Sequence, residues 1–257
     1  MPFYGEGLDG LMRARSGDLR GIVNGIDYDV FNPETDPDIV QNYNAKNFRK
    51  EKVKNKRALQ EELGLARDDK KFMIGIVSRL TSQKGLDLIQ CVMDEICTDD
   101  VQLVVLGTGD ENYENMFRHY DWKYHDRVSA QIYYSEPLSH KIYAACDAFL
   151  MPSLFEPCGL SQLMALRYGT VPIVRETGGL KDTVIPYNEY EHTGDGFSFA
   201  NYNGDELLNT VNYSKYVFFE KKAEWNKMVD RGMQKDYSWK NSKANYEGLY
   251  SYLMGES

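Results

Sequence analysis

The chain has 257 residues, 42% of them hydrophobic, so it can bury one substantial core, with or without a helical appendage. No stretch reaches the roughly 18 consecutive apolar residues of a membrane span, and the first residues lack the order of a signal peptide, so we expect a cytoplasmic protein with no membrane partner. The net charge of -9 argues against nucleic acid as a partner and favours a neutral polymer or a small metabolite. A small anion stays open as well, because one or two cations can bind it locally.

The cysteines and histidines form no recognisable metal motif. The four cysteines lack the close CxxC spacing of zinc sites and redox pairs, and the four histidines are scattered. We therefore expect reduced, mostly buried thiols and no structural metal.

The middle of the chain alternates β-branched runs with amphipathic segments, which is typical of a parallel sheet covered by helices. We expect strands at residues 72–77, 101–106, 127–133, 148–151 and 171–174. We expect helices between them at residues 86–96, 113–120, 138–145 and 160–168, the last one ended by Gly169. The predicted fold class is α/β, with a Rossmann-like, doubly wound parallel sheet whose ligands lie beyond the carboxyl ends of the strands.

The flanks differ from this core. Residues 1–35 are rich in Gly, Asp and Pro and are typical of a connection, and residues 40–65 predict a charged helix. Ser238 is expected to cap a last helix with an aromatic face, which either packs on the core or has a partner surface outside this chain. We predict three segments, at residues 1–35, 36–237 and 238–257.

The first candidate site is the loop at residues 78–85 (SRLTSQKG), between a strand and a helix. Arg79 and Lys84 can clamp a diphosphate there, Arg79 by its planar fork and Lys84 as a point charge. The alternative is two solvated loop charges, which are common.

The second candidate is the loop at residues 155–161 (FEPCGLS), which also joins a strand end to a helix. Its turn can direct N–H groups and the Ser161 hydroxyl toward an anion. A carboxylate beside a phosphate is electrostatically unfavourable, so Glu156 is expected to have another role, such as holding sugar hydroxyls or stabilising developing positive charge. The alternative is that Glu156 caps a helix.

A third glycine turn, at residues 176–182, follows another strand and can approach the same site, although Gly-Gly alone indicates only a turn. The turn at Gly107 and Gly109 lacks the third glycine and the downstream acid of a dinucleotide fingerprint, which disfavours a dehydrogenase.

Four segments in order, residues 24–27 (NGID), 78–85, 155–161 and 177–180 (TGGL), resemble the motifs of bacterial glycogen synthases and plant starch synthases. The likeness runs from about Tyr4 to Asn203. It implies the C-terminal half of a GT-B glycosyltransferase, which binds ADP-glucose and adds glucose, with retention, to an α-1,4-glucan acceptor.

The resemblance also implies roles for single residues. The donor phosphates would be bound by Arg79 and Lys84, and Glu156 would contact the glucose. Tyr134 would stack on the adenine, and Asn24 would reach the sugar. Further nucleotide-sugar contacts are implied for Cys158, Gly159, Leu160 and Ser161. No metal or other cofactor is implied beyond the substrate, because Arg and Lys neutralise the phosphate charge.

The family's N-terminal donor loop, with its Lys-x-Gly-Gly element, has no counterpart in this sequence. We expect the missing N-terminal domain to be a partner in catalysis, so the chain alone would bind donor at most. Two alternatives stay open: a non-catalytic module that binds a nucleotide sugar or glucan, and a GT-B transferase with another donor or acceptor.

Overall fold

The centre of the molecule, described by a computed structural model for residues 7–255, is a six-stranded sheet in which every paired strand is parallel. The strands are β1 (Phe72–Val77), β2 (Val101–Leu106), β3 (Val128–Gln131), β4 (Ala148–Met151), β5 (Val171–Arg175) and β6 (Phe197–Phe199). Their order across the sheet is β3-β2-β1-β4-β5-β6. The central strands are apolar on both faces, as a sheet covered on both sides requires.

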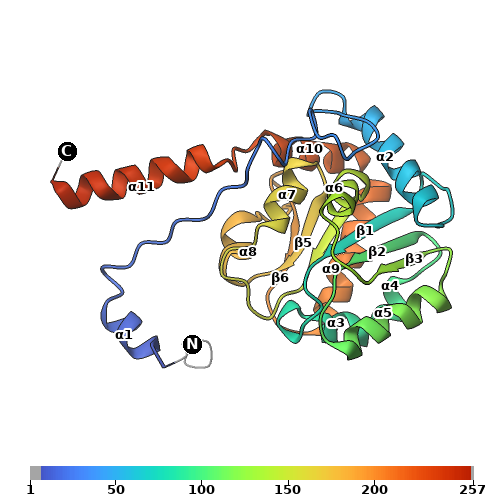
Figure 1. Cartoon of the computed structure of the whole chain (residues 1–257), viewed down its shortest axis with the longest axis horizontal. Helices are drawn as coiled ribbons and strands as arrows, with labels where there is room; N and C mark the ends of the chain where they lie inside the picture. Colours follow the sequence, from blue (N-terminus) through green and yellow to red (C-terminus); the bar gives the residue numbers. More distant parts are fainter. Residues whose placement is uncertain (1–6, 256–257) are drawn as a thin grey trace.

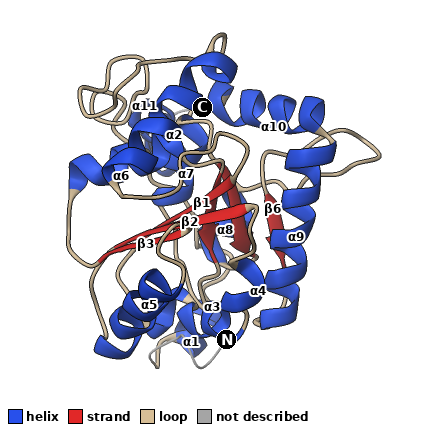
Figure 2. Cartoon of the chain, turned by 90° about the vertical axis from the view of Figure 1, so that its right-hand side faces the viewer, coloured by secondary structure: helices blue, strands red, loops and turns tan. Residues whose placement is uncertain are grey.

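Helices cover both faces of this sheet (Figure 2). The helices of the described chain, including the terminal α1 and α11 that do not cover the sheet, are α1 (Asp9–Ala14), α2 (Phe48–Glu62), the 3-10 turn η2 (Ser82–Lys84), α3 (Leu86–Cys91), α4 (Met93–Ile96), α5 (Glu111–Lys123), α6 (Glu136–Ala145), α7 (Ser161–Arg167), α8 (Gly178–Thr183), α9 (Gly204–Glu220), α10 (Lys222–Gln234) and α11 (Trp239–Met254).

Alternate residues of β1 belong to different apolar clusters. Met73 is buried with Leu59 of α2 and Ile142 of α6. Ile74 belongs to the larger cluster on the other face, with Ile89 of α3 and Val211 of α9. The period of two in the strand therefore divides the core between the two helical layers.

The strand order makes the structure doubly wound. From β1 the chain moves through β2 to β3 at one edge, and then returns to β4, which pairs with β1 on its other side. The loops after β1 and β4 thus leave the sheet side by side in opposite directions, at its topological switch point. The predicted fold class is confirmed.

Most of the predicted elements lie where the sequence places them. The structure also contains the helices α8, α9 and α10, which were not predicted, and it differs in the following places. The helix expected at residues 86–96 is interrupted at Val92, whose φ of -128° separates α3 from α4. The charged helix begins at Phe48 rather than near residue 40, because residues 44–47 form a hydrogen-bonded turn. The sixth strand, β6, was not predicted. Gly169 follows α7 with a φ of 67°, as expected for a glycine that ends a helix.

The two ends of the described chain project from the body, as Figure 1 shows for α11 and the segment that follows α1. They join the body where Ile26 N donates to Tyr237 O at 2.8 Å, and Ser242 Oγ donates to Val23 O at 2.8 Å. Ser238 precedes α11, but its side chain makes no capping hydrogen bond. Within residues 7–255, no helix combines the length and the apolar character needed to cross a membrane.

The predicted division into three segments stays a prediction. Residues 1–6 and 256–257, which belong to the first and last of these segments, lie outside the described residues, as does Tyr4, where the family resemblance begins.

Candidate functional site

The two charged loops predicted from the sequence meet at the switch point. Lys84 Nζ lies 2.6 Å from Glu156 Oε2, and the side chains are only 16% and 10% exposed. The Ser153 hydroxyl lies 3.4 Å from the same carboxylate oxygen. Lys84 closes the loop after β1 and Glu156 lies in the loop after β4, so the ion pair joins the two halves of the sheet.

A glycine allows the loops to approach this closely. Gly85 has a φ of 71°, and a Cβ built on it would lie 2.0 Å from the carbonyl oxygen of Pro152. The loops are also joined by Leu154 N, which donates to Gln83 O at 3.0 Å, and by the Gln83 side chain, which donates to Phe155 O at 3.1 Å. Only a residue without a side chain fits at this crossing.

A cavity of about 210 Å³ opens between the loops. Its polar lining consists of Ser78, Arg79, Lys84, Ser153 and Ser161. The Arg79 residue is exposed, and within residues 7–255 its guanidinium forms no ion pair with a carboxylate. The cavity therefore offers one unpaired cation, one cation shared with Glu156, and three hydroxyl groups, which suits a phosphorylated ligand.

The glycine turn after β5 supports the Glu156 loop from behind. Gly179 N donates to both Glu156 O and Pro157 O at 3.1 Å. Gly178 has a φ of 45°, and a Cβ on it would lie 2.1 Å from Glu156 O. The third predicted turn thus approaches the site, and it positions the backbone that carries the carboxylate.

The loop from Cys158 to Ser161 continues into α7. Gly159 has a φ of 71°, and the carbonyl groups of Cys158 and Gly159 accept hydrogen bonds from Gln162 Nε2 at 3.0 and 2.8 Å. Leu160 is 40% exposed, whereas Ser161 faces the cavity. The Cys158 thiol is free and partly exposed.

Two predicted site residues lie away from the cavity. Tyr134 follows β3 at the same edge of the sheet, but its side chain is 85% exposed and does not line the cavity. Asn24 borders a different cavity, together with Asp182 of α8 and Asn245 of α11. Their predicted roles stay predictions.

Arg175, which was not singled out in the sequence, holds the site together. It ends β5, and its guanidinium donates to the carbonyl oxygens of Ser153 and Leu154 in the loop that carries Glu156. Its Cζ also lies 5.5 Å from the ring centroid of Tyr202. The sequence did contain a signal for this role, because Arg175 is a cation that directly follows the predicted strand at residues 171–174.

The turn after β2 supports the site only through its backbone. Thr108 O accepts from Leu80 N at 2.8 Å, and a Cβ on Gly107 would lie 1.8 Å from Ser78 O. This turn therefore packs beneath the Arg79 loop.

One group of residues has the composition of a metal site. One potential ligand atom from each of Asp36, Asp38 and His140 lies within 4.8 Å of the others. The Asp36 carboxylate, however, is bonded to His140 Nδ1 at 2.7 Å and to the Tyr168 hydroxyl. Burial favours a higher pKa for Asp36, but these hydrogen bonds outweigh it and hold the pKa below its usual value. The group joins the segment before α2 to α6 and α7.

Known proteins share this architecture. A family model described as glycosyl transferases group 1 matches residues 60–215. The glycogen synthase of Lachnospira eligens is 74% identical over 98% of this chain and 53% of its own length. That of Clostridium acetobutylicum is 55% identical over the same shares of the two chains. This chain thus spans about half the length of these relatives.

Solved structures agree. The catalytic domain of starch synthase IV from Arabidopsis thaliana, bound to ADP and acarbose, has a TM-score of 0.90 and 35% identity over 98% of this chain and 52% of that chain. A sucrose-phosphate synthase from Thermosynechococcus elongatus has a TM-score of 0.64 at 20% identity, covering 97% of this chain and 57% of that chain, a likeness of fold.

The doubly wound sheet, with a charged crevice at its switch point, defines a glycosyltransferase domain of the GT-B type. The family model covers more than half of the residues. The chain therefore belongs to the glycosyl transferases group 1 family, and the resemblance to glycogen and starch synthases is confirmed.

Proposed function

We propose that the chain is the donor-binding half of a retaining glucosyltransferase, which adds glucose from ADP-glucose to the non-reducing end of an α-1,4-glucan. The observation that carries this proposal is the Lys84–Glu156 pair beside the Arg79 guanidinium at the switch point. Relatives named glycogen synthase, and a neighbour solved with ADP and acarbose, support the donor and acceptor classes.

In this proposal the cations act on the leaving group. Bond cleavage between glucose C1 and the phosphate oxygen leaves the electron pair on ADP, so negative charge grows there while positive charge grows at C1. Arg79 and Lys84 stabilise the phosphate charge without a metal or other cofactor. Glu156 stabilises the sugar side, and the loop at Gly159, Leu160 and Ser161 contacts phosphate.

Adenine is the proposed base, because the relative at 35% identity was solved with ADP. The exposed Tyr134 ring is available for stacking, and Asn24 and Cys158 complete the proposed sugar and nucleotide contacts. Stacking tolerates any base, so Tyr134 alone does not select adenine. Weaker binding of UDP than of ADP is the expected result of a direct comparison.

Transfer is proposed to require the part of the relatives that this chain does not span. A site assembled between two domains depends on positioning, which contributes several orders of magnitude to rate. We expect the 257-residue chain to bind ADP, and to transfer glucose at background level.

Titration calorimetry with ADP tests the binding roles. Arg79→Ala and Lys84→Ala should each raise the Kd at least about tenfold, the effect of losing one charge-assisted contact to a phosphate. Lys46→Ala, which removes an exposed cation before α2, serves as the matched control and should leave the Kd unchanged. Equal affinity in all four proteins would refute the assignment.

A further inference from the structure

A second cavity, also of about 210 Å³, lies at the opposite edge of the sheet. Its lining includes Asp147, which directly precedes β4, and Gly169, which lies two residues before β5. The cavity therefore faces the amino ends of the strands, whereas Ser153 and Glu156 follow their carboxyl ends. At about 3.3 Å per residue, the four residues of β4 separate the two cavities by roughly 13 Å.

The charge of this cavity is positive, although the whole chain carries -9. Its basic lining residues are Arg49, Lys52, Lys56 and Lys222. Two carboxylates also line it, and both are neutralised by partners: Asp147 accepts from Lys56 at 2.7 Å, and Asp69 accepts from Arg57 at 2.7 Å. The remaining charge comes from three cations.

Two of these cations stand at the exposed rim. Within residues 7–255, neither Arg49 nor Lys222 forms an ion pair with a carboxylate. Arg49 Cζ lies 4.7 Å from the ring centroid of Phe48, and Lys222 Nζ lies 3.5 Å from that of Phe218. Aromatic faces stabilise exposed cations by only about 0.5–1 kcal/mol and do not neutralise them. The rim is thus ready to accept an anion.

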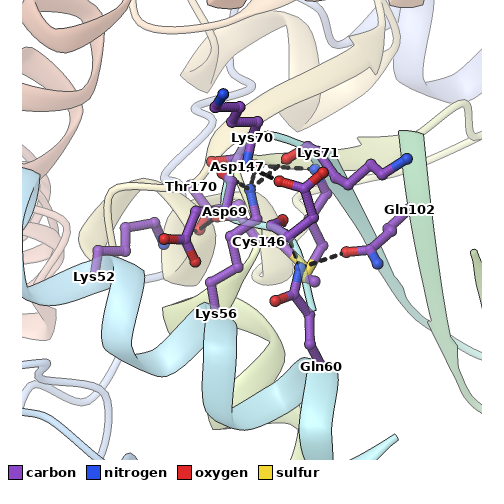
Figure 3. A network of polar contacts seen from close by, with 12 residues as sticks. Lys52, Lys56, Gln60, Asp69, Lys70, Lys71, Gln102, Cys146, Asp147 and Thr170 are labelled. Carbon is purple, nitrogen blue, oxygen red and sulfur yellow. Dashed lines mark hydrogen bonds and ion pairs between the residues drawn. The ribbon is translucent and has the colours of Figure 1, made fainter. Parts of the chain in front are cut away.

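The third cation, Lys52, lies deeper. Figure 3 shows Lys52 and Lys56 projecting from α2 toward Thr170 and Asp147, which directly precede β5 and β4. The Lys52 ammonium donates to Thr170 Oγ1 at 2.7 Å and otherwise only to carbonyl oxygens, the nearest being that of Ala144 at 2.9 Å. Its hydrogen-bond partners are neutral, so its charge also lacks a directly bonded counter-ion.

We propose that this cavity binds a phosphate group, with Arg49 and Lys222 contacting its oxygens and Lys52 stabilising it from below. A phosphate balances most of the charge of the three cations that have no carboxylate partner. A cavity of this size holds several water molecules and so accommodates a phosphate with a small organic group. The apolar wall for that group consists of Phe218, Trp225 and Val229.

The pKa values of two of the cations agree with this geometry. Burial lowers the pKa of Lys52 to about 7. Desolvation lowers the pKa of Lys222; attraction by Asp147 opposes this shift, and repulsion by Lys56 adds to it. In both lysines the lowered pKa reflects mainly loss of solvation, so an anion bound beside these ammonium groups would favour their charged forms.

Nuclear magnetic resonance of the tryptophan indole groups tests the proposal on the whole chain. There are three tryptophans, and only Trp225 lines this cavity, so its signal can be assigned with Trp225→Phe. Titration with inorganic phosphate, at constant ionic strength set by chloride, should shift the Trp225 signal saturably. Signals of Trp122 and Trp239 should stay in place.

Variants at the rim show whether the named cations cause the shift. The double variant Arg49→Gln/Lys222→Gln should raise the Kd for phosphate at least about fivefold, since two charge-assisted contacts are lost. The control Lys50→Gln/Lys227→Gln removes two exposed cations from the same helices, outside the cavity lining, and should change it less than about twofold. An unshifted Trp225 signal, or an unchanged Kd in the rim variant, overturns the proposal.

The source of the phosphate is distinguished by a second probe. Glycerol 3-phosphate binding tighter than inorganic phosphate identifies a phosphate monoester, because its carbon chain then contacts the apolar wall. Equal affinity identifies free phosphate. Binding of both probes at the Arg79 cavity, without a response at Trp225, contradicts the site itself.

Discussion

The Lys84–Glu156 ion pair sets the electrostatics of the switch point. In the proposed function, an incoming diphosphate would share Lys84 with a carboxylate 2.6 Å away, and the same carboxylate would repel the phosphates. A neutral group at this position would release the cation. The acid therefore weakens donor binding, and its proposed benefit lies on the sugar side.

We accordingly expect Glu156→Gln to bind ADP more tightly than the wild type, by about fivefold, or ~1 kcal/mol, the usual worth of a partly solvated ion pair. Titration calorimetry measures this. Glu220→Gln removes an exposed acid from the end of α9 and serves as the control. Weaker ADP binding by Glu156→Gln would show that the carboxylate orders the site for the nucleotide.

Lys52 is the residue whose titration should affect stability. Burial lowers its pKa to about 7 in the folded chain, whereas the unfolded value is 10.5. Between these values the unfolded state binds more protons, so the free energy of unfolding rises with pH. The titratable groups acting on Lys52 are Cys146, Asp147 and Lys56.

From pH 7 to pH 9, the free energy of unfolding of the wild type should rise by roughly 2 kcal/mol relative to that of Lys52→Met. Urea unfolding at both pH values measures the difference. Lys50→Met, an exposed position on the same helix, should follow the wild type. A constant difference between wild type and Lys52→Met would mean that Lys52 keeps an ordinary pKa.

Much of the candidate site was accessible from the sequence, because Arg79, Lys84 and Glu156 lie in loops that directly follow predicted strands. Parallel strands place such loops at one edge. The role of Arg175 was not accessible, since its partners are backbone carbonyl groups about 20 residues away, and backbone acceptors leave no mark in a sequence. The burial of Lys52 could not be predicted either, because its ammonium group also donates to backbone carbonyl oxygens.

At the level of elements, strands were easier to predict than helix ends. The runs at β1 and β2 are apolar apart from Gln102, and at six residues each they are too short for a typical helix. β6 has only three residues and depends on pairing with β5, so it is too short for a local hydrophobic pattern to predict it. The break at Val92 was not predicted either, because the apolar periodicity of the sequence continues across it.

The crossing of the loops after β1 and β4 depends on Gly85. Gly85→Ala would face both a left-handed φ of 71° and a Cβ position 2.0 Å from Pro152 O. Gly64→Ala is the matched control, because its φ is 69° and no atom lies within 4 Å of a Cβ there. Comparing the two variants separates the effect of the left-handed backbone from the effect of the steric clash with Pro152 O.

Gly64→Ala should lower the free energy of unfolding by about 1–2 kcal/mol and leave ADP binding unchanged. Gly85→Ala should cost at least about 2 kcal/mol more, and it should weaken ADP binding, since the displaced loop no longer holds Arg79 and Lys84 at the cavity. Thermal unfolding and calorimetry measure the two effects. Equal losses in both variants would show that the loop at Pro152 moves aside without consequence.

At the scale of the whole molecule, α11 is attached mainly by its first turn. Ser242 is buried and bonded to Val23 O, but the last residues of the helix are exposed. Exposed apolar side chains there include Tyr250 (60%), Tyr252 (71%), Leu253 (69%) and Met254 (72%). Of the two possibilities that the sequence left open, packing of this aromatic face on the core is therefore wrong for its second half.

A helix stabilised at one end only should open readily from the other. Backbone amides beyond about residue 246 should exchange with solvent far faster than those of α9, whose buried side includes Leu207 and Val211. Hydrogen exchange followed by mass spectrometry measures this, and light scattering at rising concentration shows whether the exposed face instead drives self-association. A monomer whose α11 amides are as protected as those of α9 would refute both outcomes, and would show that the aromatic face is stable in water without a partner.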